Sequence, residues 1–503
     1  MPVDSLYASP NEIKDKDKEA IIRQLSPMLN VSQAYLRDRL YRKKSFVWIA
    51  RKITPEQSIA VNRLSIKGLG FLKESKRSYP NSYLASHIIG FAGLDNVGLE
   101  GLEIYYNKYL KGEAGWALFL RDARQKKLDL WEKMVLPKDG YALALTIDEV
   151  VQYIAERELD KAFKAYHAKG GSIVVMNPHT GAILALANRP TFDLNEYNNA
   201  NKDEMRNRAI CDLFEPGSVF KIVTASAALE EKKVSEEDRF FCENGSYRVA
   251  NHTLHDHRPH GWLTFREVIE QSSNIGTTKV AQILGNDVIY RYVRLFGFGS
   301  RLGIELPGEI PGMIKEPRLW SKVSIAAVPI GQEVGVTALQ LAAAISVIAN
   351  GGQLMKPYII QEIRDKYGET IKEFSPLMVR KVISLDTSER VKKILIGAVE
   401  RGTGKLAKIT GINAAGKTGT AQKLEPNGAY SHNKFIASFI GFAPAEDPIV
   451  AIVVILDEPH PYYFGGVVAA PVFKNVASDA IKYLKTSQSA NEVIALNENK
   501  AVN

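Results

Sequence analysis

The sequence predicts an α/β (α+β) fold in which helices cover a mainly antiparallel sheet, preceded by an N-terminal domain of mixed structure. Two strands are expected within residues 170–188, helical segments dominate from about residue 218 to residue 350, and strands return at 436–443 and 448–456. A strand pair, a helical insert and a return to strands describe one sheet with helices packed on it. A chain of 503 residues has room for this domain and at least one more.

The N-terminal 147 residues are predicted to form a domain of their own. Residues 14–30 and 32–46 carry apolar side chains at helical spacing, and glycine-rich punctuation follows at residues 90–103. Residues 140–148, GYALALTID, alternate in the manner of an edge strand. The change of pattern directly after this strand places the domain boundary there.

The second predicted domain opens with an amphipathic helix over residues 148–168 that has an acidic first turn. Residues 170–188 read as a hairpin with its turn at Asn177–Gly181. A helix over residues 470–484 closes the domain, and we expect the polar tail that follows to be disordered. Val336–Ala349 is the most apolar helical stretch, but about 14 residues are too few to span a membrane, so it is predicted to be a core helix.

The composition limits the class of protein. With 45% hydrophobic and 24% charged residues the chain is an ordinary globular protein. The net charge of +9 includes basic clusters at residues 37–52 and 63–77, which are either a solvated face or a region near anionic lipid or an acidic polymer. No nucleic-acid-binding motif accompanies the charge. Cys211 and Cys242 allow one disulfide at most, and Cys211 is expected to be a buried thiol.

A first candidate catalytic pair lies in FEPGSVFK, where Ser218 and Lys221 stand three residues apart after a Pro-Gly turn. Residues at this spacing share one face of a helix. A serine hydroxyl becomes a useful nucleophile when a base takes its proton, and a lysine amine can do so when its pKa is lowered. Because Ser-x-x-Lys also occurs by chance, a surface serine and lysine remain the alternative for this motif alone.

A second candidate is the triplet Ser272, Ser273 and Asn274 in EQSSNIGTTK. The Ser272 hydroxyl can relay a proton, and the Asn274 amide can both donate to a substrate carbonyl and accept from a substrate N–H. The alternative is a helix cap, since serine and asparagine are both favoured at that position.

A third candidate is the segment Lys417–Thr420 in AAGKTGTAQK. Small residues allow an extended substrate to lie along a strand edge, Lys417 supplies charge, and the threonine hydroxyls can hold a carboxylate. A phosphate-binding loop is the rival interpretation, because residues 411–418 match Gly-x-x-x-x-Gly-Lys-Ser/Thr. Such a loop should open a long helix, whereas residues 419–434 are rich in Gly, Pro and Asn.

The order of the three motifs is more informative than any one of them. Ser-x-x-Lys, Ser-x-Asn and Lys-Thr-Gly in this order are the signature of penicillin-recognising serine enzymes. The chain resembles a monofunctional class B penicillin-binding protein over nearly all its length, through NRAICDLFEPGSVFK, QSSNIGTTKVA, IGQEVGVTALQLAAAISVIANGG and GKTGTAQK. Residues 77–115, beginning RSYPNSYLASHIIGFAG, resemble the pedestal that precedes that domain. The Ser-Ser-Asn triplet is more similar to the septal-division and sporulation branch than to the elongation branch.

The resemblance implies a penicillin-binding transpeptidase fold with a pedestal (dimerisation-type) domain at 1–147, a transpeptidase domain at 148–485 and a polar tail at 486–503. It implies a serine D,D-transpeptidase that cross-links peptidoglycan stem peptides through an acyl-enzyme and is acylated by β-lactams. The catalytic residues would then be Ser218, Lys221, Ser272, Asn274 and Lys417. The substrate-binding residues would be Thr418, Gly419 and Thr420. Backbone N–H groups of Ser218 and Thr420 would form the oxyanion hole.

The resemblance also implies a place and partners. Expected partners are stem peptides, β-lactam antibiotics, a cell-wall glycosyltransferase and divisome membrane proteins, with no nucleic acid. The expected location is the extracytoplasmic face of the bacterial plasma membrane, and the family's membrane anchor is expected to be absent from this chain. No cofactor or metal is expected, although His252, His255, His257 and His260 cluster in one polar loop. A β-lactamase, and a β-lactam sensor or non-catalytic scaffold using the same domain, remain alternatives.

Overall fold

A computed structural model describes residues 1–121, 127–425 and 428–501. The chain divides into two compact units, one comprising Met1–Ser82 and Ile89–Asp139 and the other comprising Tyr83–Ile88 and Gly140–Asn503. The boundary predicted after residue 147 lies inside the second unit, between its first strand and its first long helix.

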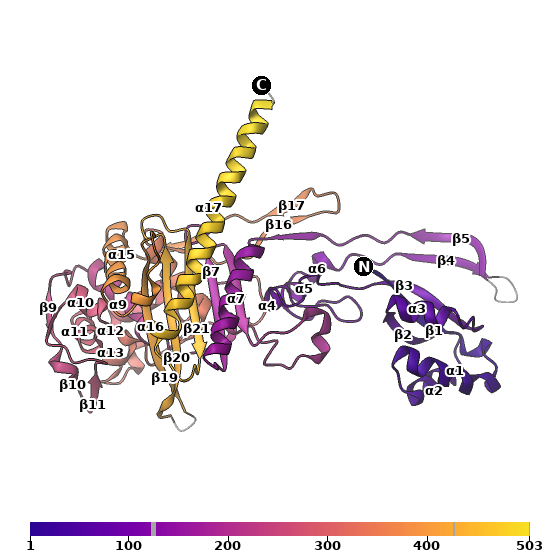
Figure 1. The fold of residues 1–503 in the computed structure, drawn as a ribbon, viewed down its shortest axis with the longest axis horizontal. Helices are drawn as coiled ribbons and strands as arrows, with labels where there is room; N and C mark the ends of the chain where they lie inside the picture. The colour runs from indigo at the N-terminus through magenta and orange to yellow at the C-terminus, as the bar shows by residue number, and fades with distance from the viewer. Residues whose placement is uncertain (122–126, 426–427, 502–503) are drawn as a thin grey trace. The chain divides into compact units, whose positions relative to one another are not determined.

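The first unit contains an antiparallel sheet of order β2-β1-β3, formed by β1 (Pro2–Ala8), β2 (Val47–Ile53) and β3 (Leu69–Ser75). The predicted helices are present as α1 (Asp15–Leu29) and α2 (Gln33–Leu40), and both bury their apolar stripe against this sheet (Figure 1). The other elements of this part are α3 (Pro55–Asn62), α5 (Gly101–Tyr105), α6 (Asn107–Leu110), β4 (Trp116–Arg121) and β5 (Lys127–Val135); the short α4 (Ser86–Ile89) follows β3.

The second unit is built on a five-stranded antiparallel sheet of order β19-β20-β21-β7-β8. Its strands are β7 (Gly170–Met176), β8 (Ile183–Arg189), β19 (Ala415–Leu424), β20 (Tyr430–Ala443) and β21 (Val450–Asp457). The predicted hairpin of β7 and β8 is confirmed, and its turn closes through the Gly181 N–H, which donates to the Asn177 carbonyl at 3.0 Å. Because β21, β7 and residues 436–443 of β20 are nearly all buried, the sheet is covered on both faces.

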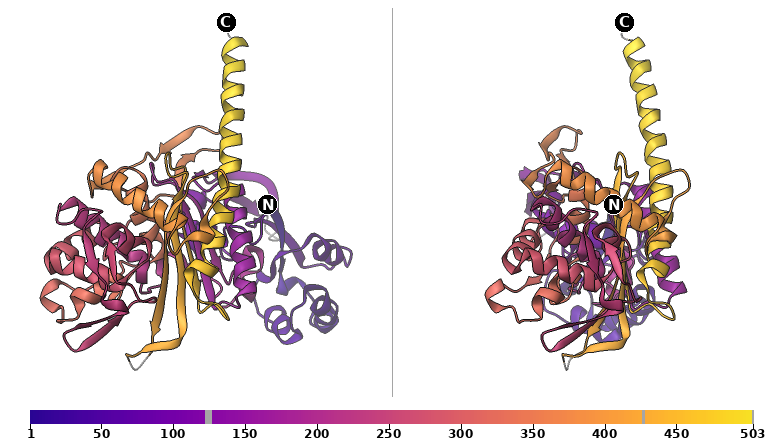
Figure 2. Two further views of the ribbon diagram at one scale, coloured as in Figure 1. Left: turned by 60° about the vertical axis from the view of Figure 1, so that its left-hand side comes forward. Right: turned by 90° about the vertical axis from the view of Figure 1, so that its left-hand side faces the viewer.

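Two helices cover one face of this sheet: α7 (Glu149–Ala165) and α17 (Ala470–Ala501) (Figure 1). The Asp148 carboxylate caps α7 by accepting from the N–H groups of Val150 and Val151. The prediction that the chain is irregular after residue 485 is wrong, because α17 continues to Ala501 (Figure 2). The segment after Pro471 contains no glycine or proline that would end a helix.

The helical insert lies on the opposite face of the sheet (Figure 1). Its core is α14 (Ala338–Ala349), in which every residue is buried, as predicted. The other helices of the second unit are α8 (Arg208–Cys211), α9 (Lys221–Glu230), α10 (Phe265–Glu270), α11 (Asn274–Leu284), α12 (Asn286–Leu295), α13 (Ser324–Ala327), α15 (Leu385–Glu400) and α16 (Gly465–Val468), the last of which packs against α17.

Short strands complete the second unit. The predicted edge strand is β6 (Ala142–Leu145), at the edge of a three-stranded sheet of order β17-β16-β6. The remaining strands are β9 (Arg239–Phe241), β10 (Ser246–Val249), β11 (His252–His255), β12 (Trp262–Thr264), β13 (Met313–Ile314), β14 (Val334–Gly335), β15 (Gln353–Met355), β16 (Ile360–Arg364), β17 (Thr370–Glu373) and β18 (Met378–Lys381). Among the described residues no helix has the length and apolarity needed to cross a bilayer.

Candidate active site

Ser218 lies in the 3-10 helix Gly217–Phe220, which runs directly into α9. Gly217 has a positive φ of 59°, and its N–H donates to the Gly331 carbonyl at 3.1 Å. A side chain at Gly331 would overlap the backbone of Gly217, so the two segments can approach this closely only because residue 331 is a glycine. The serine is therefore presented from a fixed turn at the start of a helix.

Lys221 follows Ser218 by one helical turn and is fully buried. Its Nζ donates to the Ser272 carbonyl at 2.6 Å, to Asn274 Oδ1 at 2.8 Å and to Ser272 Oγ at 3.2 Å. Burial lowers the pKa of Lys221 to about 7, against the opposing pull of the Asp256 carboxylate. Within the part of the chain that the structure describes, Ser218 Oγ makes no hydrogen bond, so the expected contact between the serine and the lysine is not formed here.

Lys417 approaches Ser272 from the sheet. Its Nζ donates to Ser272 Oγ at 2.8 Å, so this hydroxyl stands between the two lysine amines. Burial, together with the neighbouring charge of Lys221, lowers the pKa of Lys417 well below its ordinary value. Ser272 is held in the left-handed region, with φ of 62°, which is uncommon for a residue other than glycine and indicates a constrained position.

The two interpretations of the Ser-Ser-Asn triplet apply to different residues. Ser273 is the helix cap: it precedes α11, and its Oγ accepts from the Gly276 N–H at 2.9 Å. Ser272, one residue earlier, points to the lysines instead. Asn274 offers Oδ1 to Lys221, while its Nδ2 donates to the His255 carbonyl at 2.9 Å. The triplet thus both starts a helix and supplies polar groups to the site.

Asp256 was not identified by the sequence analysis, although it orders this triplet. Its carboxylate accepts from the Ser273 hydroxyl at 2.6 Å and from the N–H groups of Asn274 and Ile275 at 2.5 and 3.0 Å. A carboxylate at a helix start is favoured by the exposed N–H groups there. The only sequence signal was its place in the histidine-rich loop, between His255 and His257.

Lys417–Thr420 lie within β19, the edge strand of the five-stranded sheet. The alternative of a phosphate-binding loop is therefore wrong, because the lysine is inside a strand that continues to Leu424 rather than at the start of a helix. Thr418 Oγ1 lies 2.7 Å from Thr403 Oγ1, and Thr420 Oγ1 accepts from the Gly465 N–H at 3.0 Å. Thr403, like Asp256, was missed by the sequence analysis.

Gly419 packs against the segment that carries Ser218. A Cβ atom at this position would overlap the Ser438 side chain and press on Val219 and on the Pro216 carbonyl. Glycine here lets the serine segment lie directly on β19. Gly419 does not line the cleft described next, unlike the threonines on either side of it.

A cleft of about 820 Å³ brings together side chains from all three motifs. Ser218, Ser272, Asn274, Thr418 and Thr420 line it, and the buried amines of the two lysines lie behind its wall. Its other walls are aromatic and cationic, formed by Phe435, Tyr463, Phe464, His257, Arg258, Arg401 and Lys405. A concave site of this size with converging polar groups is typical of a ligand-binding cleft.

Within the described residues the cysteines form no disulfide and the histidines take part in no candidate metal site. Both Cys211 and Cys242 are free thiols, so the one disulfide that the sequence allows is not formed. Cys211 is only partly buried, which differs from the prediction, whereas Cys242 is fully buried. No group of three or more potential metal ligands comes together among the described residues.

Residues 171–478 match the penicillin-binding protein transpeptidase domain family, and residues 1–145 match the penicillin-binding protein dimerisation domain. The chain belongs to the penicillin-binding protein transpeptidase family. Stage V sporulation protein D of Bacillus subtilis is 39% identical over 97% of this chain and 77% of its own length. The peptidoglycan D,D-transpeptidase FtsI of Escherichia coli is 32% identical over 97% of this chain and 82% of its own length.

A solved structure that is similar to this chain also belongs to a penicillin-binding protein. Penicillin-binding protein 3 of Mycobacterium tuberculosis, complexed with aztreonam, is 32% identical with a TM-score of 0.73, covering 83% of this chain and 91% of that chain. The predicted family, enzyme class and fold of this penicillin-binding protein are confirmed.

Proposed function

We propose that this penicillin-binding protein is a peptidoglycan D,D-transpeptidase that cross-links stem peptides through an acyl-enzyme on Ser218. The observation that carries the assignment is the cleft, in which Ser218, the Ser272–Asn274 pair and the Thr418–Thr420 strand face one space in front of two buried lysines. A nucleophile, a base of lowered pKa and a strand edge for the substrate are the parts that acyl transfer needs.

In the first half-reaction Ser218 Oγ attacks the penultimate D-Ala carbonyl while Lys221 takes the hydroxyl proton. With a pKa near 7, a substantial fraction of Lys221 is neutral at neutral pH. In the free enzyme the Lys221 Nζ faces Ser272 and Asn274. To act as the base, the amine would have to turn towards Ser218, which lies one helical turn earlier, when substrate binds. Hydrogen bonds of catalytic groups are often loose before substrate arrives.

Collapse of the tetrahedral intermediate breaks the bond between carbon and nitrogen, and the terminal D-Ala leaves after its nitrogen gains a proton. We assign this proton transfer to Ser272. Its Oγ is within hydrogen-bond distance of both Lys221 Nζ and Lys417 Nζ, so a proton given to the leaving nitrogen can be replaced from an amine. Asn274 would orient the substrate's amide bond from the same wall.

The substrate would lie antiparallel to the free edge of β19, as an added strand. In that pose the backbone N–H groups of Ser218 and Thr420 would hold the oxyanion, and such donors typically contribute about 3–4 kcal/mol each to transition-state stability. The Thr418 hydroxyl, held by Thr403, would donate to the terminal carboxylate of the stem peptide or of a β-lactam.

In the second half-reaction an amine of a neighbouring stem peptide attacks the Ser218 ester. The attacking nitrogen gives up a proton through Ser272 to Lys221, a new amide bond forms, the ester bond breaks, and the serine oxygen takes that proton from Lys221. A β-lactam would acylate Ser218 by the same first step, but its ring nitrogen stays tethered to the acyl group.

The cellular role is proposed from the family resemblance. We assign the enzyme to septal cell-wall synthesis, or to sporulation, at the outer face of the plasma membrane. A cell-wall glycosyltransferase and divisome membrane proteins would be its partners. Relatives named stage V sporulation protein D and FtsI support this branch.

The test is turnover of a pentapeptide stem with an added acceptor amine, followed by mass spectrometry. The expected products are free D-Ala and a cross-linked dimer, and Ser218→Ala should give neither product nor a penicillin adduct while keeping its melting temperature. Covalent penicillin labelling without cross-linked product would instead favour a β-lactam sensor, and rapid release of hydrolysed penicillin would favour a β-lactamase.

A further inference from the structure

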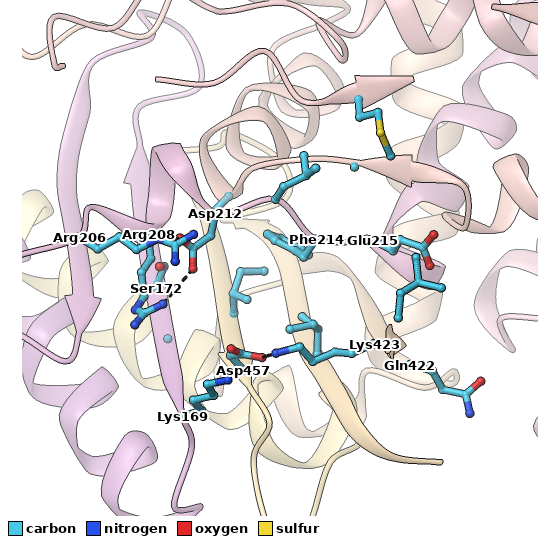
Figure 3. Close-up of a pocket in the computed structure, with 18 of the residues that line it drawn as sticks. Lys169, Ser172, Arg206, Arg208, Asp212, Phe214, Glu215, Gln422, Lys423 and Asp457 are labelled. Carbon is cyan, nitrogen blue, oxygen red and sulfur yellow. Dashed lines mark hydrogen bonds and ion pairs between the residues drawn. The ribbon is translucent and has the colours of Figure 1, made fainter. Parts of the chain in front are cut away.

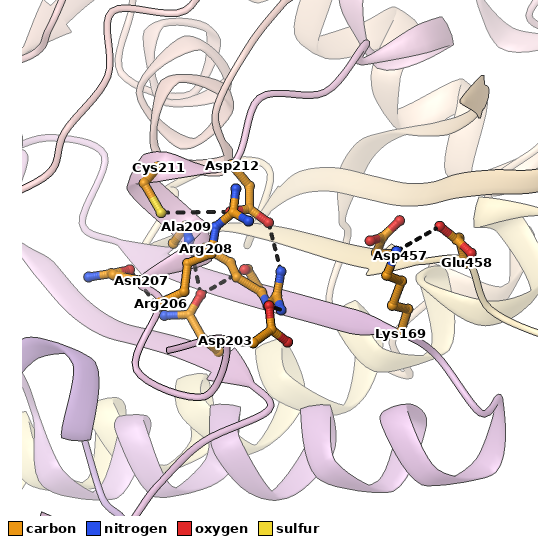
Figure 4. A network of polar contacts seen from close by, with 12 residues as sticks. Lys169, Asp203, Arg206, Asn207, Arg208, Ala209, Cys211, Asp212, Asp457 and Glu458 are labelled. Carbon is orange, nitrogen blue, oxygen red and sulfur yellow. Dashed lines mark hydrogen bonds and ion pairs between the residues drawn. The ribbon is translucent and has the colours of Figure 1, made fainter. Parts of the chain in front are cut away.

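The second unit has another cavity besides the catalytic cleft, of about 500 Å³, and its cationic side chains are all paired (Figure 3). Figure 4 shows the arginines at one end of it, each of which contacts a carboxylate. The pairs are Lys423 with Asp457, Lys169 with Glu458, Arg208 with Asp203 and Asp212, and Arg206 with Asp212. The cations of this cavity are therefore already neutralised within the protein.

The catalytic cleft differs, because two of the cations that line it have no partner. These are Arg258 and Lys405, whose side chains make no hydrogen bond or ion pair with any other described residue. The one carboxylate among the lining residues, that of Asp256, already accepts from the Ser273 hydroxyl and from N–H groups at the start of α11. Positive charge in the cleft thus exceeds negative charge, which favours anionic ligands.

A third cation, Arg401, is fixed in the wall of the cleft by a buried carboxylate. Its Nη2 donates to Glu270 Oε1 at 2.6 Å, and the Glu270 side chain is only 4% exposed. A Cβ atom at Gly397 would overlap both of these atoms, so the glycine leaves room for the pair. The Arg401 side chain is nevertheless 57% exposed, and its contact with Glu400 is looser, at 3.6 Å. Because a guanidinium has five N–H donors, Arg401 retains donors that a ligand can reach.

Arg401 and Lys405 belong to one wall segment, residues 401–406, at the end of the cleft where a carboxylate is expected. Thr403 lies between them in the sequence, and its Oγ1 is 2.7 Å from Thr418 Oγ1. In the proposed pose the donor stem peptide ends with its terminal carboxylate at Thr418, and the rest of it extends along β19 away from this segment. The donor peptide therefore leaves both cations unused.

The acceptor has to enter from the side on which the terminal D-Ala leaves. Its nitrogen bonds to the acyl carbon as the Ser218 ester bond breaks, and the proton that the nitrogen loses returns to the serine oxygen. This step is the reverse of the departure of D-Ala, so the entering nitrogen takes the place of the leaving one. A carboxylate next to that nitrogen can then occupy Thr418, as that of D-Ala did. A further anionic group of the acceptor would lie near residues 401–406.

We propose that Arg401 and Lys405 bind a second carboxylate of the acceptor, and so select an amine that carries one carboxylate beside its nitrogen and another on its side chain. The inference rests on the proposed transpeptidase function and names the class of acceptor for it. Arg401, held by Glu270, directs N–H groups at the carboxylate, and Lys405 adds a second charge. Because both cations are exposed, the preference should be modest, about three- to tenfold.

The test compares D-glutamate with D-glutamine as acceptors. The two amino acids have nearly the same shape and share the carboxylate next to the amine, but only D-glutamate has a second one. Each is supplied separately with the pentapeptide stem and the full chain, and mass spectrometry gives the ratio of aminolysed to hydrolysed stem. We expect D-glutamate to give the higher ratio, by about three- to tenfold. The preference should shrink as salt is added, because exposed charges are screened.

Variants of the wall segment locate the effect. Lys405→Gln should reduce the preference, and Lys405→Glu should reverse it in favour of D-glutamine, which general damage to the site would not do. Lys408→Gln, at an exposed lysine in the same part of the chain but outside the cleft, is the matched control and should keep the parental preference. Arg401→Gln should also reduce the preference, but it leaves the buried Glu270 carboxylate unpaired, so its melting temperature is measured alongside.

The outcomes separate this inference from the function on which it rests. Equal ratios for the two acceptors, or a preference for D-glutamate that survives in both Lys405 variants, would overturn the inference while penicillin labelling of Ser218 remained normal. Failure of both the stem peptide and penicillin to acylate Ser218 would overturn the proposed function and the inference together.

Discussion

Asp256 holds the second motif in place, and replacing it with asparagine tests that role with little change of shape. Oδ1 of the aspartate accepts from two backbone N–H groups, and an asparagine oxygen can do the same. The asparagine Nδ2 would donate to Ser273 Oγ, which can accept a second hydrogen bond besides that from Gly276. Asp256→Asn therefore removes a charge and retains a hydrogen bond at each position.

The cost in stability follows from the change in hydrogen-bond type. A hydrogen bond to a charged group contributes about 1.5–3 kcal/mol and a neutral one about 0.5–1.5 kcal/mol, so each of three bonds loses about 1 kcal/mol. We expect the free energy of unfolding to fall by up to about 3 kcal/mol, measured by urea titration. Asp256→Ala, which leaves the Asn274 and Ile275 N–H groups without this acceptor, should lose more stability and should also acylate far more slowly.

The pH dependence distinguishes a role at the active site from a purely structural one. The Asp256 carboxylate favours the ammonium form of Lys221, whose pKa is about 7. Removing the negative charge lowers that pKa further, so the neutral amine persists to lower pH. The acid limb of the acylation rate for fluorescent penicillin should move to lower pH in Asp256→Asn and stay in place in Asp386→Asn, an exposed control. A limb that does not move, or moves to higher pH, would refute the coupling.

Three other substitutions test separate parts of the site. Lys221→Arg should abolish acylation at every pH up to 9, because arginine stays protonated, and a measurable penicillin adduct at the parental rate would contradict the assignment of the base. Thr418→Val should slow acylation by carboxylate-bearing β-lactams about ten- to a hundredfold but affect an ester analogue much less; equal losses would show that Thr418 only shapes the strand. Gly419→Ala should lower both the acylation rate and the melting temperature, since its Cβ presses on the Pro216 carbonyl and on Val219, and a variant with both unchanged would show that the serine segment yields easily.

Elements with a strong local pattern were predicted well. The helix after Asp148 has a clear amphipathic period, the hairpin has a turn signal at Asn177–Gly181, and Ala338–Ala349 is a continuous apolar run; all three are present. The wrong prediction at the C-terminal end also came from the local sequence pattern. A polar sequence after residue 485 reads as irregular, but polarity alone does not stop a helix when no glycine or proline interrupts it.

The polar contacts within the site could not be predicted in the same way. Asp256 and Thr403 belong to loops without periodic pattern, and each gains its position from a partner distant in sequence, Ser273 and Thr418 respectively. Burial of Lys221 depends on how α11 and β19 pack around it, which no spacing within FEPGSVFK encodes. The motif predicts which residue types meet, whereas the tertiary structure determines which atoms do.

The shared contact of two lysines with Ser272 explains why three separate motifs are required. A single amine at the surface would keep its ordinary pKa, about 10.4, and would be a poor base at neutral pH. Burial lowers the pKa of each lysine here, and the positive charge of Lys221 lowers the pKa of Lys417 further. Two amines this close cannot both hold a proton easily, so protonation of one favours the neutral form of the other. When Ser218 transfers its proton to Lys221, Ser272 connects the protonated amine with the leaving nitrogen of D-Ala, which needs a proton.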